Sequence, residues 1–401
     1  MAIDNKDKKV LNVPHLRFPE FSGEWDSFKL VELGKFIGGG TPSSSNLSFW
    51  TGSIPWISSS DIKEDNINNI SISRYITEDA IEKSATKYCP APVILIVSRV
   101  GVGKVALSHT SLCTSQDFCN IIEIKCHPVF LSYNLLRTMK RKSREVQGTS
   151  IKGITSDELQ KIRVFIPKNK DEQNKISNLL TLLDERIATQ NKIIEDLKKL
   201  KSAIIDYAIN SLDTDFAKFG SLYETAGEGG TPTTSNASFY DNGKIPFVKI
   251  DDLKQKYLTE NKDFITELGL QKSSAWLVPT RSILFSNGAT IGEITITTYP
   301  VCTKQGILGI VPKSNIDVEF LYYFMSSTYF KKAISRIVTE GTMKTAYLKD
   351  IANILCPIPT KEKQQGIAKM PSALNSKIDY EQSLLKLFIM QKQYLLRQMF
   401  I

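Results

Sequence analysis

The first residues that could do chemistry are a glycine pair followed by hydroxyl side chains, GGTPSSSNLSFW at 39–50. Glycine-rich turns can cradle a phosphate, because their backbone amides approach the anion closely. A phosphate-binding loop also needs a lysine soon after the glycines, and no lysine stands at that spacing here. Residues 229–240 read GGTPTTSNASFY, so nearly the same segment occurs again. The segment therefore serves something that the chain does twice.

Other catalytic motifs are missing or incomplete. Residues 101–105 read GVGKV, but Ser98 replaces the first glycine of a GxxxxGK[ST] loop and Val105 replaces its Mg²⁺-binding hydroxyl. The sequence contains no HExxH, no GxSxG and no dinucleotide fingerprint. The Asn/Asp-Pro-Pro-aromatic tetrapeptide of amino-methyltransferases is also missing. The sequence favours binding over catalysis, and we expect no catalytic residue in this chain.

Cysteine and histidine do not form a metal-binding pattern. The chain has six cysteines and three histidines, and no CxxC pair occurs among them. Cys119, Cys126 and His127 are close in sequence, but the spacing of the two cysteines is not that of a zinc site. We expect reduced, buried thiols and no bound metal.

Composition places this chain among globular proteins with a polyanionic partner. Its 401 residues suggest more than one domain, and 41% of them are hydrophobic. The formal net charge is +9, which favours a partner such as nucleic acid. The longest apolar run, 92–97, is far below the roughly 18 residues that cross a bilayer, and the N-terminus has no apolar signal segment. We expect a cytoplasmic protein without a membrane partner.

The repeat extends over the whole chain. The matched segments are IPWI at 54–57 with IPFV at 245–248, CTSQ at 113–116 with CTKQ at 302–305, Gly148-Thr149 with Gly341-Thr342, and Ile166-Pro167 with Ile358-Pro359. The offset stays between 188 and 193 residues, which indicates duplicated domains and not a solenoid. Short apolar runs such as 93–97 and 282–285 predict buried strands, and short helices are expected near 128–142 and 316–335.

Each half ends in a long helix with a heptad seam. The first helix is expected over about 171–210. The apolar seam residues are Ile176, Leu180, Leu183, Ile187, Ile194, Leu197, Ile367, Leu374, Ile378, Leu385, Phe388 and Leu395. The polar seam positions also coincide, since Gln190 matches Glu381 and Lys201 matches Lys392. Pro371 predicts a kink, or a second helix that begins after it.

The chain order of globule, helix, globule and helix predicts that the second helix runs back along the first. We expect the α+β class, with two duplicated mixed α/β domains separated by two long antiparallel coiled-coil helices in pseudo-two-fold symmetry. A helix of about 38 residues would hold the globules about 55 Å apart. The expected boundaries are a polar tail at 1–17, a first domain at 18–168, a first helix at 169–212, a second domain at 213–360 and a second helix at 361–401.

The motifs taken in order resemble the specificity subunit of type I restriction–modification systems. The resemblance rests on FPEF with GEW at 18–25, the two GGTP and two IP-aromatic segments, SNGATIG at 286–292 and both helices. It implies that each domain is a target recognition domain reading one half of an asymmetric bipartite DNA site, with the helices setting the spacer. It also implies two adenine-methyltransferase subunits and a motor-nuclease subunit as partners. S-adenosylmethionine, ATP and Mg would belong to those partners, and this chain would hold no cofactor. The first half departs from the pattern at 99–103, where RVGVG stands opposite GATIG.

Polar residues in or beside the repeated motifs are the candidates for DNA contacts, because Arg, Lys, Asn and Gln can read base edges. The candidates in the first domain are Ser58, Ser59, Ser60, Lys63, Arg99, Lys104, Gln116 and Lys152. The candidates in the second domain are Lys249, Asp251, Lys254, Asn287, Lys304, Gln305 and Lys344. Two domains that read different half-sites need different reading residues, so Lys304 opposite Ser115 is a better candidate for base recognition than any shared motif.

Two questions stay open at the level of sequence. The GGTP segments could be scaffold turns, or they could contact a DNA backbone or a partner. The alternative function is a structural, partner-binding coiled-coil scaffold whose duplicated domains bind protein and not DNA. Salt dependence separates the two functions, because phosphate contacts make log affinity fall linearly with log salt.

Overall fold

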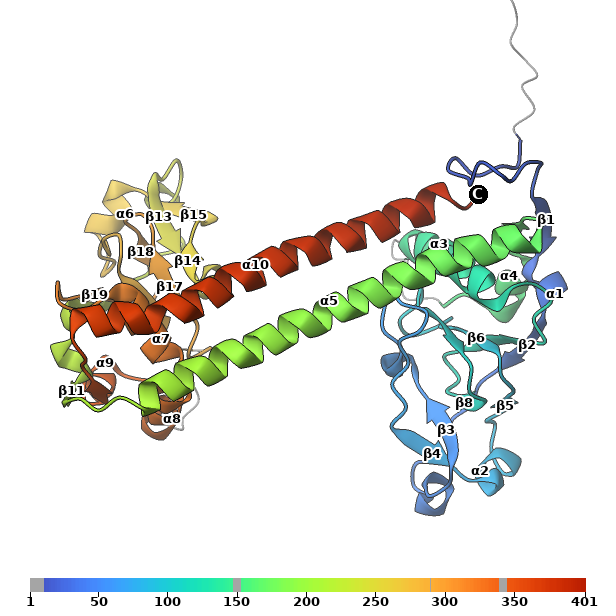
Figure 1. Cartoon of the computed structure of the whole chain (residues 1–401), viewed down its shortest axis with the longest axis horizontal. Helices are drawn as coiled ribbons and strands as arrows, with labels where there is room; N and C mark the ends of the chain where they lie inside the picture. Colours follow the sequence, from blue (N-terminus) through green and yellow to red (C-terminus); the bar gives the residue numbers. More distant parts are fainter. Residues whose placement is uncertain (1–10, 147–152, 289, 339–344) are drawn as a thin grey trace, which may run out of the picture. The chain divides into compact units, whose positions relative to one another are not determined.

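The computed structural model describes residues 11–146, 153–288, 290–338 and 345–401 (Figure 1). The chain divides into two units: residues 1–191 with 384–401 form unit 1, and residues 192–383 form unit 2. The candidate residues Lys152 and Lys344, and both Gly-Thr pairs, lie outside the described residues.

Unit 1 contains two four-stranded sheets. The first has the order β2 (Lys35–Gly38), β9 (Cys119–Ile122), β6 (Val93–Ile96) and β7 (Val105–Ser108). The second has the order β4 (Arg74–Ile76), β3 (Ile54–Ile57), β8 (Leu112–Thr114) and β5 (Tyr88–Cys89). Every residue of β6 is buried, which explains why its sequence is a continuous apolar run without alternation. A two-stranded ladder joins β1 (Asp26–Lys29) to β10 (Arg163–Ile166).

Helix α3 (Pro128–Val146) packs on β6 and β7 and confirms the helix expected near 128–142. Its residues Phe130 and Tyr133 join Trp25 in the main core of the unit, where none of the three is more than 1% exposed. The remaining short elements are α1 (Leu30–Leu33), η1 (Leu47–Trp50), η2 (Ser59–Asp61), α2 (Glu78–Glu82) and α4 (Ser156–Lys161).

Unit 2 repeats this plan with small changes. Its large sheet has the order β12 (Tyr223–Glu228), β19 (Ile307–Pro312), β16 (Ile283–Ser286), β17 (Ile294–Thr297) and β14 (Tyr257–Leu258). The small sheet has the order β15 (Asp263–Ile265), β13 (Ile245–Val248) and β18 (Cys302–Thr303), and a ladder joins β11 (Phe216–Lys218) to β20 (Leu355–Pro357). Its short helices are η3 (Phe219–Ser221), η4 (Ala237–Phe239), η5 (Ile250–Asp252), α6 (Glu267–Gln271) and α9 (Leu348–Ile351).

The small sheets show that the sequence repeat is a repeat of fold. Strand β3 runs parallel to β8 with Trp56 opposite Cys113, and β13 runs parallel to β18 with Phe247 opposite Cys302. The main difference lies after the large sheet, where the helical region expected near 316–335 forms α7 (Val318–Ser326) and α8 (Thr328–Ile337). The chain breaks at Ser327 because its hydroxyl caps the start of α8 by accepting from Phe330 N at 3.3 Å.

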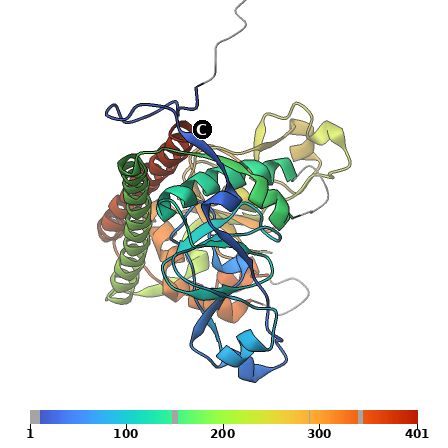
Figure 2. The same cartoon turned by 90° about the vertical axis from the view of Figure 1, so that its right-hand side faces the viewer.

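Helices α5 (Lys170–Asn210) and α10 (Lys361–Gln398) follow the two domains, and they lie side by side in both views (Figure 1 and Figure 2). In unit 1 the start of α5, with Ile176 and Leu180, shares a core with Leu396 at the end of α10. In unit 2 the end of α5, with Ile205, shares a core with Ala368 at the start of α10. The helices are therefore antiparallel, as predicted, and each predicted seam position is buried or half-buried.

Pro371 neither starts nor ends the second helix. Helix α10 begins at Lys361, so the expectation of a helix that starts after Pro371 is wrong. Ile367 and Ala368, in the first turns, pack against the core of unit 2, and this contact holds the segment before the proline in helical form. In the described part of the chain, no helix has both the length and the apolar character needed to cross a membrane.

Candidate functional site

The GGTP segments are turns that need glycine for close packing. A Cβ atom on Gly39 would lie 2.0 Å from the carbonyl oxygen of Ser115, and one on Gly229 would lie 2.2 Å from Thr303 Oγ1. Neither glycine has a φ in the left-handed region, so close approach and not an unusual backbone angle requires glycine here. The structure thus gives these glycines a scaffold role against the ends of β8 and β18.

The threonine of each turn reaches a candidate reading residue. Thr41 Oγ1 donates a hydrogen bond to Gln116 Oε1, and the backbone amide of Gln305 donates to Thr231 Oγ1 at 3.3 Å. Both glutamine side chains are exposed. The repeated turn therefore positions an exposed amide at the same place in each unit.

The aromatic residue that ends each segment closes the loop on itself. Trp50 Nε1 donates to the carbonyl of Ser43 at 3.1 Å, and Tyr240 donates its hydroxyl hydrogen to the carbonyl of Pro232 at 2.5 Å. The hydroxyl side chains between these points are exposed. They are free to face a ligand, although no ligand contact is needed to explain the loop.

At the end of β3 lies a cation, Arg74, that was not among the residues predicted from the sequence. The Arg74 guanidinium stacks on Trp56 at 4.5 Å from the ring centroid, donates to Ser58 Oγ at 2.7 Å and pairs with Asp61. Arg74 comes from the neighbouring strand β4, opposite Trp56 in register. It lies outside every repeated segment, which is why sequence reasoning missed it.

Unit 2 has a cation at the equivalent place, but a different strand supplies it. Lys249 follows β13 as Ser58 follows β3, and its Nζ pairs with Asp263 at 2.8 Å. Asp263 lies opposite Phe247, the register position that Arg74 holds opposite Trp56. The exchanges Ser58 to Lys249 and Arg74 to Asp263 therefore keep one positive group at this point. These two exchanges, considered together, could have indicated from the sequence that Arg74 and Lys249 are equivalent.

The loop after β6 joins two groups of candidates in unit 1. Lys104 Nζ donates to the carbonyl of Ser59 at 3.1 Å, which ties the 99–104 loop to η2. Gly101 and Gly103 have φ of 89° and 111°, values that a side chain would strain. Arg99 at the start of this loop is exposed. Ser58, Ser59, Lys104 and the newly found Arg74 thus form one cluster.

Asn287 differs from the other candidates because it is buried, with 1% of its surface exposed. Its Nδ2 donates to the carbonyl of Ala346 at 3.2 Å. The backbone amide of Asn287 donates to the carbonyl of Gly306, and the backbone amide of Ser98 donates to the carbonyl of Asp117 in the same way. Asn287 therefore corresponds to Ser98 of the first unit, and the next residue, Gly288, corresponds to Arg99. The sequence placed Asn287 among side chains that reach a surface ligand, and the structure places it in the support of the turn.

The remaining candidates lie at the surface. The exposed ones are Ser60, Lys63, Lys249, Asp251, Lys254 and Lys304. Lys304 and its counterpart Ser115 differ most clearly, since Ser115 is 3% exposed and bonds Asp117. The backbone amide of Ser115 bonds Ile57 at the end of β3, and that of Lys304 bonds Val248 at the end of β13. The same scaffold therefore presents a buried hydroxyl in one unit and a cation in the other.

The polar seam positions of the long helices have matched partners. Lys392 Nζ pairs with Asp184, and both side chains are no more than 5% exposed. Tyr133 donates its hydroxyl hydrogen to Asp184 at 2.8 Å, and burial with the nearby carboxylate raises the pKa of Tyr133. In unit 2, Lys201 Nζ donates to Asn375 Oδ1 at 2.9 Å, and burial lowers the pKa of Lys201.

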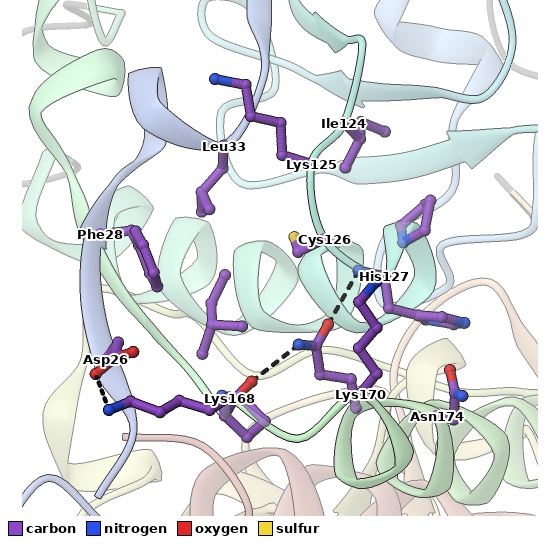
Figure 3. Close-up of a pocket in the computed structure, with 14 residues that line it drawn as sticks. Asp26, Phe28, Leu33, Ile124, Lys125, Cys126, His127, Lys168, Lys170 and Asn174 are labelled. Carbon is purple, nitrogen blue, oxygen red and sulfur yellow. Dashed lines mark hydrogen bonds and ion pairs between the residues drawn. The ribbon is translucent and has the colours of Figure 1, made fainter.

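A cavity of about 590 Å³ lies where α5 begins (Figure 3). Gln173 lines this cavity. Its side chain accepts a hydrogen bond from His127 N at 3.0 Å and donates one to Pro167 O at 2.9 Å. Gln364 makes the same pair of bonds at the start of α10, to Asp317 N and Pro359 O at 2.8 Å each. In each unit, this glutamine therefore connects the recognition domain to the first turns of the long helix that follows it.

The thiols have no metal-binding arrangement. Five of the six cysteines are buried and Cys126 is half-buried, and all are free thiols. Burial raises the pKa of Cys113 to about 12 and that of Cys126 to about 12, which keeps them protonated. Among the residues that the structure describes, no group of three or more His, Cys, Asp or Glu side chains could hold a metal ion.

Comparison with known proteins agrees with this duplicated architecture. The family model for the type I restriction modification DNA specificity domain matches residues 22–199 and again residues 213–387. The specificity subunit of the type I restriction enzyme MjaIX from Methanocaldococcus jannaschii is 28% identical over 386 residues, which covers 88% of each chain.

Two solved structures share the fold over nearly the whole chain. The type I restriction-modification S subunit from M. genitalium has a TM-score of 0.57 at 18% identity and covers 97% of this chain and 99% of that one. A chain from a study of assembly and conformational transition of the type I R-M system has a TM-score of 0.62 at 15% identity, with 93% and 95% covered. Since the family model accounts for both halves, this chain belongs to the type I restriction–modification DNA specificity family and is a specificity subunit with two target recognition domains.

Proposed function

We propose that each unit reads one half of an asymmetric, bipartite double-stranded DNA site. One observation carries this proposal: the two units present different exposed side chains on one repeated scaffold. Lys304 stands where Ser115 is buried, and Arg99 stands where the second unit has Gly288. A cation such as Lys304 can donate to guanine in the major groove, whereas a buried hydroxyl cannot reach a base edge.

Positions that both units share suit contacts to the phosphate backbone, which carry no sequence information. Arg74 and Lys249 supply such a shared cation, and Gln116 and Gln305 supply a shared amide. Ser and Thr hydroxyls and backbone amides of the GGTP turns are also suitable donors to phosphate. The shared scaffold would set the register on the duplex, and the side chains that differ would read its bases.

The helix pair would set the spacer between the half-sites. Helix α5 has 41 residues in one uninterrupted segment, which corresponds to a length of about 60 Å. The Lys392–Asp184 and Lys201–Asn375 contacts fix the register of α5 against α10 within each unit. A fixed register is what a constant spacer requires.

Exposed apolar side chains on the helices supply a surface for partner subunits. On α5 these are Ile193, Leu200 and Tyr207, which are 40%, 49% and 77% exposed at seven-residue spacing. On α10 the same spacing relates Tyr380, Leu387 and Tyr394, which are 57%, 58% and 52% exposed. A helix of a partner can pack on such a stripe. We assign the stripes to two methyltransferase subunits, one for each recognition domain.

The chemistry of the complex would reside in those partners. This chain binds and positions DNA in the cytoplasm, the methyltransferase subunits hold S-adenosylmethionine and methylate adenine, and motor-nuclease subunits use ATP and Mg²⁺ to cleave. No catalytic motif in the sequence supports a reaction on this chain itself.

The test is to express the chain with a methyltransferase subunit of a type I system and to sequence the modified adenines of the host. The proposal predicts methylation at one asymmetric motif made of two specified half-sites around an unspecified spacer of constant length. Methylation that stays unchanged when this chain is omitted would contradict it. A purified chain that binds the partner but shows no salt-dependent DNA affinity in the complex would instead favour a protein-binding scaffold.

A further inference from the structure

Unit 1 contains a second cavity, and Lys63 is the one candidate for DNA contacts that lines it. It has a volume of about 900 Å³ and lies between the 63–69 loop, α3, α5 and α10. Its apolar lining includes Leu136, Ile187 and Leu396, and its polar lining is dominated by lysine and arginine. The volume is in the range of roughly 300–1,000 Å³ that is common for small-molecule sites.

The charges around this cavity are not balanced. Seven cations and three carboxylates line it. Two of the carboxylates are already paired, since Asp65 accepts from Lys140 at 2.7 and 2.8 Å and Asp184 pairs with Lys392. Over the described ranges, no carboxylate lies within ion-pair distance of Lys63, Arg141, Arg144 or Arg397, which also line the cavity.

Arg137 is a partly buried cation of this cavity that lies near a second cation, Arg141. Burial, with a contribution from the nearby Arg141 cation, lowers the pKa of the Arg137 guanidinium. Its Nη1 donates to the main-chain oxygen of Ile401 at 2.5 Å. An anion in the cavity would relieve this repulsion.

The arginines that line this cavity are not repeated in unit 2. Shifting the sequence by 191 residues puts Asp206 in place of Arg397, and Asp206 Oδ1 accepts from Thr328 N at 2.7 Å to cap α8. The uninterrupted α3, which carries Arg137, Arg141 and Arg144, is replaced in unit 2 by α7 and α8 with a break between them. The same shift puts Lys331 and Lys332 in place of Lys140 and Arg141, so unit 2 keeps part of the positive charge, but none of the four arginines that line the cavity is repeated there.

We propose that this cavity binds a polyphosphate group, carried by inorganic triphosphate or by a nucleoside di- or triphosphate. Guanidinium groups present forked donors that match phosphate oxygens, and several of them together suit a ligand with several negative charges. The apolar wall at Leu136, Ile187 and Leu396 can hold a nucleoside, and the Asn66 and Asn191 amides can bond its polar atoms. A DNA duplex is too wide to enter a cavity of this volume.

The experiment measures binding to the full purified chain by isothermal titration calorimetry. The probes are inorganic triphosphate, ATP and adenosine, and the variants are R141Q/R397Q and the matched control K83Q/K87Q, whose lysines are exposed elsewhere in unit 1. Melting curves without ligand check that each variant is folded. We expect saturable binding of triphosphate and ATP, at least tenfold weaker in R141Q/R397Q and unchanged in the control.

The probes separate the two sources of the phosphate group. Equal affinities for triphosphate and ATP assign the site to the phosphates alone, whereas tighter binding of ATP shows that the apolar wall holds the nucleoside. Absence of saturable binding of both anions overturns the proposal. Equal weakening in R141Q/R397Q and K83Q/K87Q also overturns it, because binding would then depend on overall charge and not on this cavity. Neither result bears on the proposed DNA recognition, because neither Arg141 nor Arg397 is among the candidates for DNA contacts.

Discussion

Lys392 of α10 forms a buried ion pair with Asp184 of α5, and the same lysine donates to the carbonyl of Asp65 in the recognition domain. Its counterpart in unit 2 is the hydrogen bond from Lys201 to Asn375, at 2.9 Å. The two contacts are related by the internal repeat, but the acceptor is a carboxylate in one and a neutral amide in the other. They join the two helices at matched points of the seam.

The difference between these acceptors predicts unequal costs of mutation. Lys392→Met leaves a buried carboxylate without its cation and is expected to destabilise the protein by about 3–5 kcal/mol. Lys201→Met leaves only an amide without its donor, at a cost of about 1–3 kcal/mol. Urea denaturation of both variants measures this. Adding Asp184→Asn to Lys392→Met should restore part of the loss, because the amide carries no charge and can still accept from Tyr133. Equal effects of the two single variants would contradict the assignment.

Replacing a glycine of the GGTP turns by alanine should destabilise the protein by steric overlap, and the neighbouring Gly38 offers a control. Gly39→Ala places a Cβ against the carbonyl of Ser115, and such overpacking costs about 1–3 kcal/mol or more. Gly38→Ala meets no atom within 4 Å and should leave the melting temperature unchanged. Gly229→Ala should act on unit 2 as Gly39→Ala acts on unit 1. A melting temperature for Gly39→Ala equal to that of Gly38→Ala would show that the turn can give way.

Substitution of Lys304 should change the recognition of one half-site only. In Lys304→Ser the second domain carries the residue that the first has at this position, so specificity should relax or change in one half of the motif. One good base contact is worth about 1–3 kcal/mol of discrimination. Sequencing of methylated adenines measures both halves in the same sample. If affinity falls equally for all sequences, Lys304 contacts phosphate and the base-reading role is wrong.

Substitution of Arg74 should lower the affinity for DNA and leave the recognised sequence unchanged, because both units place a cation at its position. Arg74→Gln should weaken DNA binding without changing the motif, and the slope of log affinity against log salt should become shallower by about 0.9 for one lost phosphate contact. The measurement is a salt titration of the complex with its methyltransferase partner. Lys83→Gln, a charge loss at an exposed residue of the same unit, is the control and should leave the slope unchanged. A motif altered in the first half would instead make Arg74 a base-reading residue.

Patterns with a period could be predicted from the sequence, and isolated contacts could not. The duplicated segments gave the repeated fold, and the heptad seam gave the antiparallel helices with Lys201 and Lys392 as polar positions. Of the two effects expected of Pro371, the later helix start is wrong, because packing of Ile367 and Ala368 against unit 2 supports the turns before the proline. The break at Ser327 depends on one capping hydroxyl, which apolar periodicity does not show.

The site residues show the same limit. Asn287 and Lys304 both belong to motifs that marked them as candidates, but Asn287 is 1% exposed and Lys304 lies at the surface. Only tertiary packing separates them. Arg74 takes the place of Lys249 from a neighbouring strand, so the equivalence exists in space and not along the sequence. An alignment of the two halves could reveal it only by treating the two exchanges as a pair.

The length of the spacer in the methylated motif after matched helix deletions shows whether the helices set that spacer. Removing 187–193 from α5 and 380–386 from α10 takes one heptad from each helix and keeps Lys392–Asp184 and Lys201–Asn375 in register. Seven residues of helix correspond to about 10 Å, or about three base pairs of duplex. If the helices set the spacer, both half-sites are unchanged and the spacer shortens by about three base pairs. A spacer of unchanged length in the methylated genome would contradict this role of the helices.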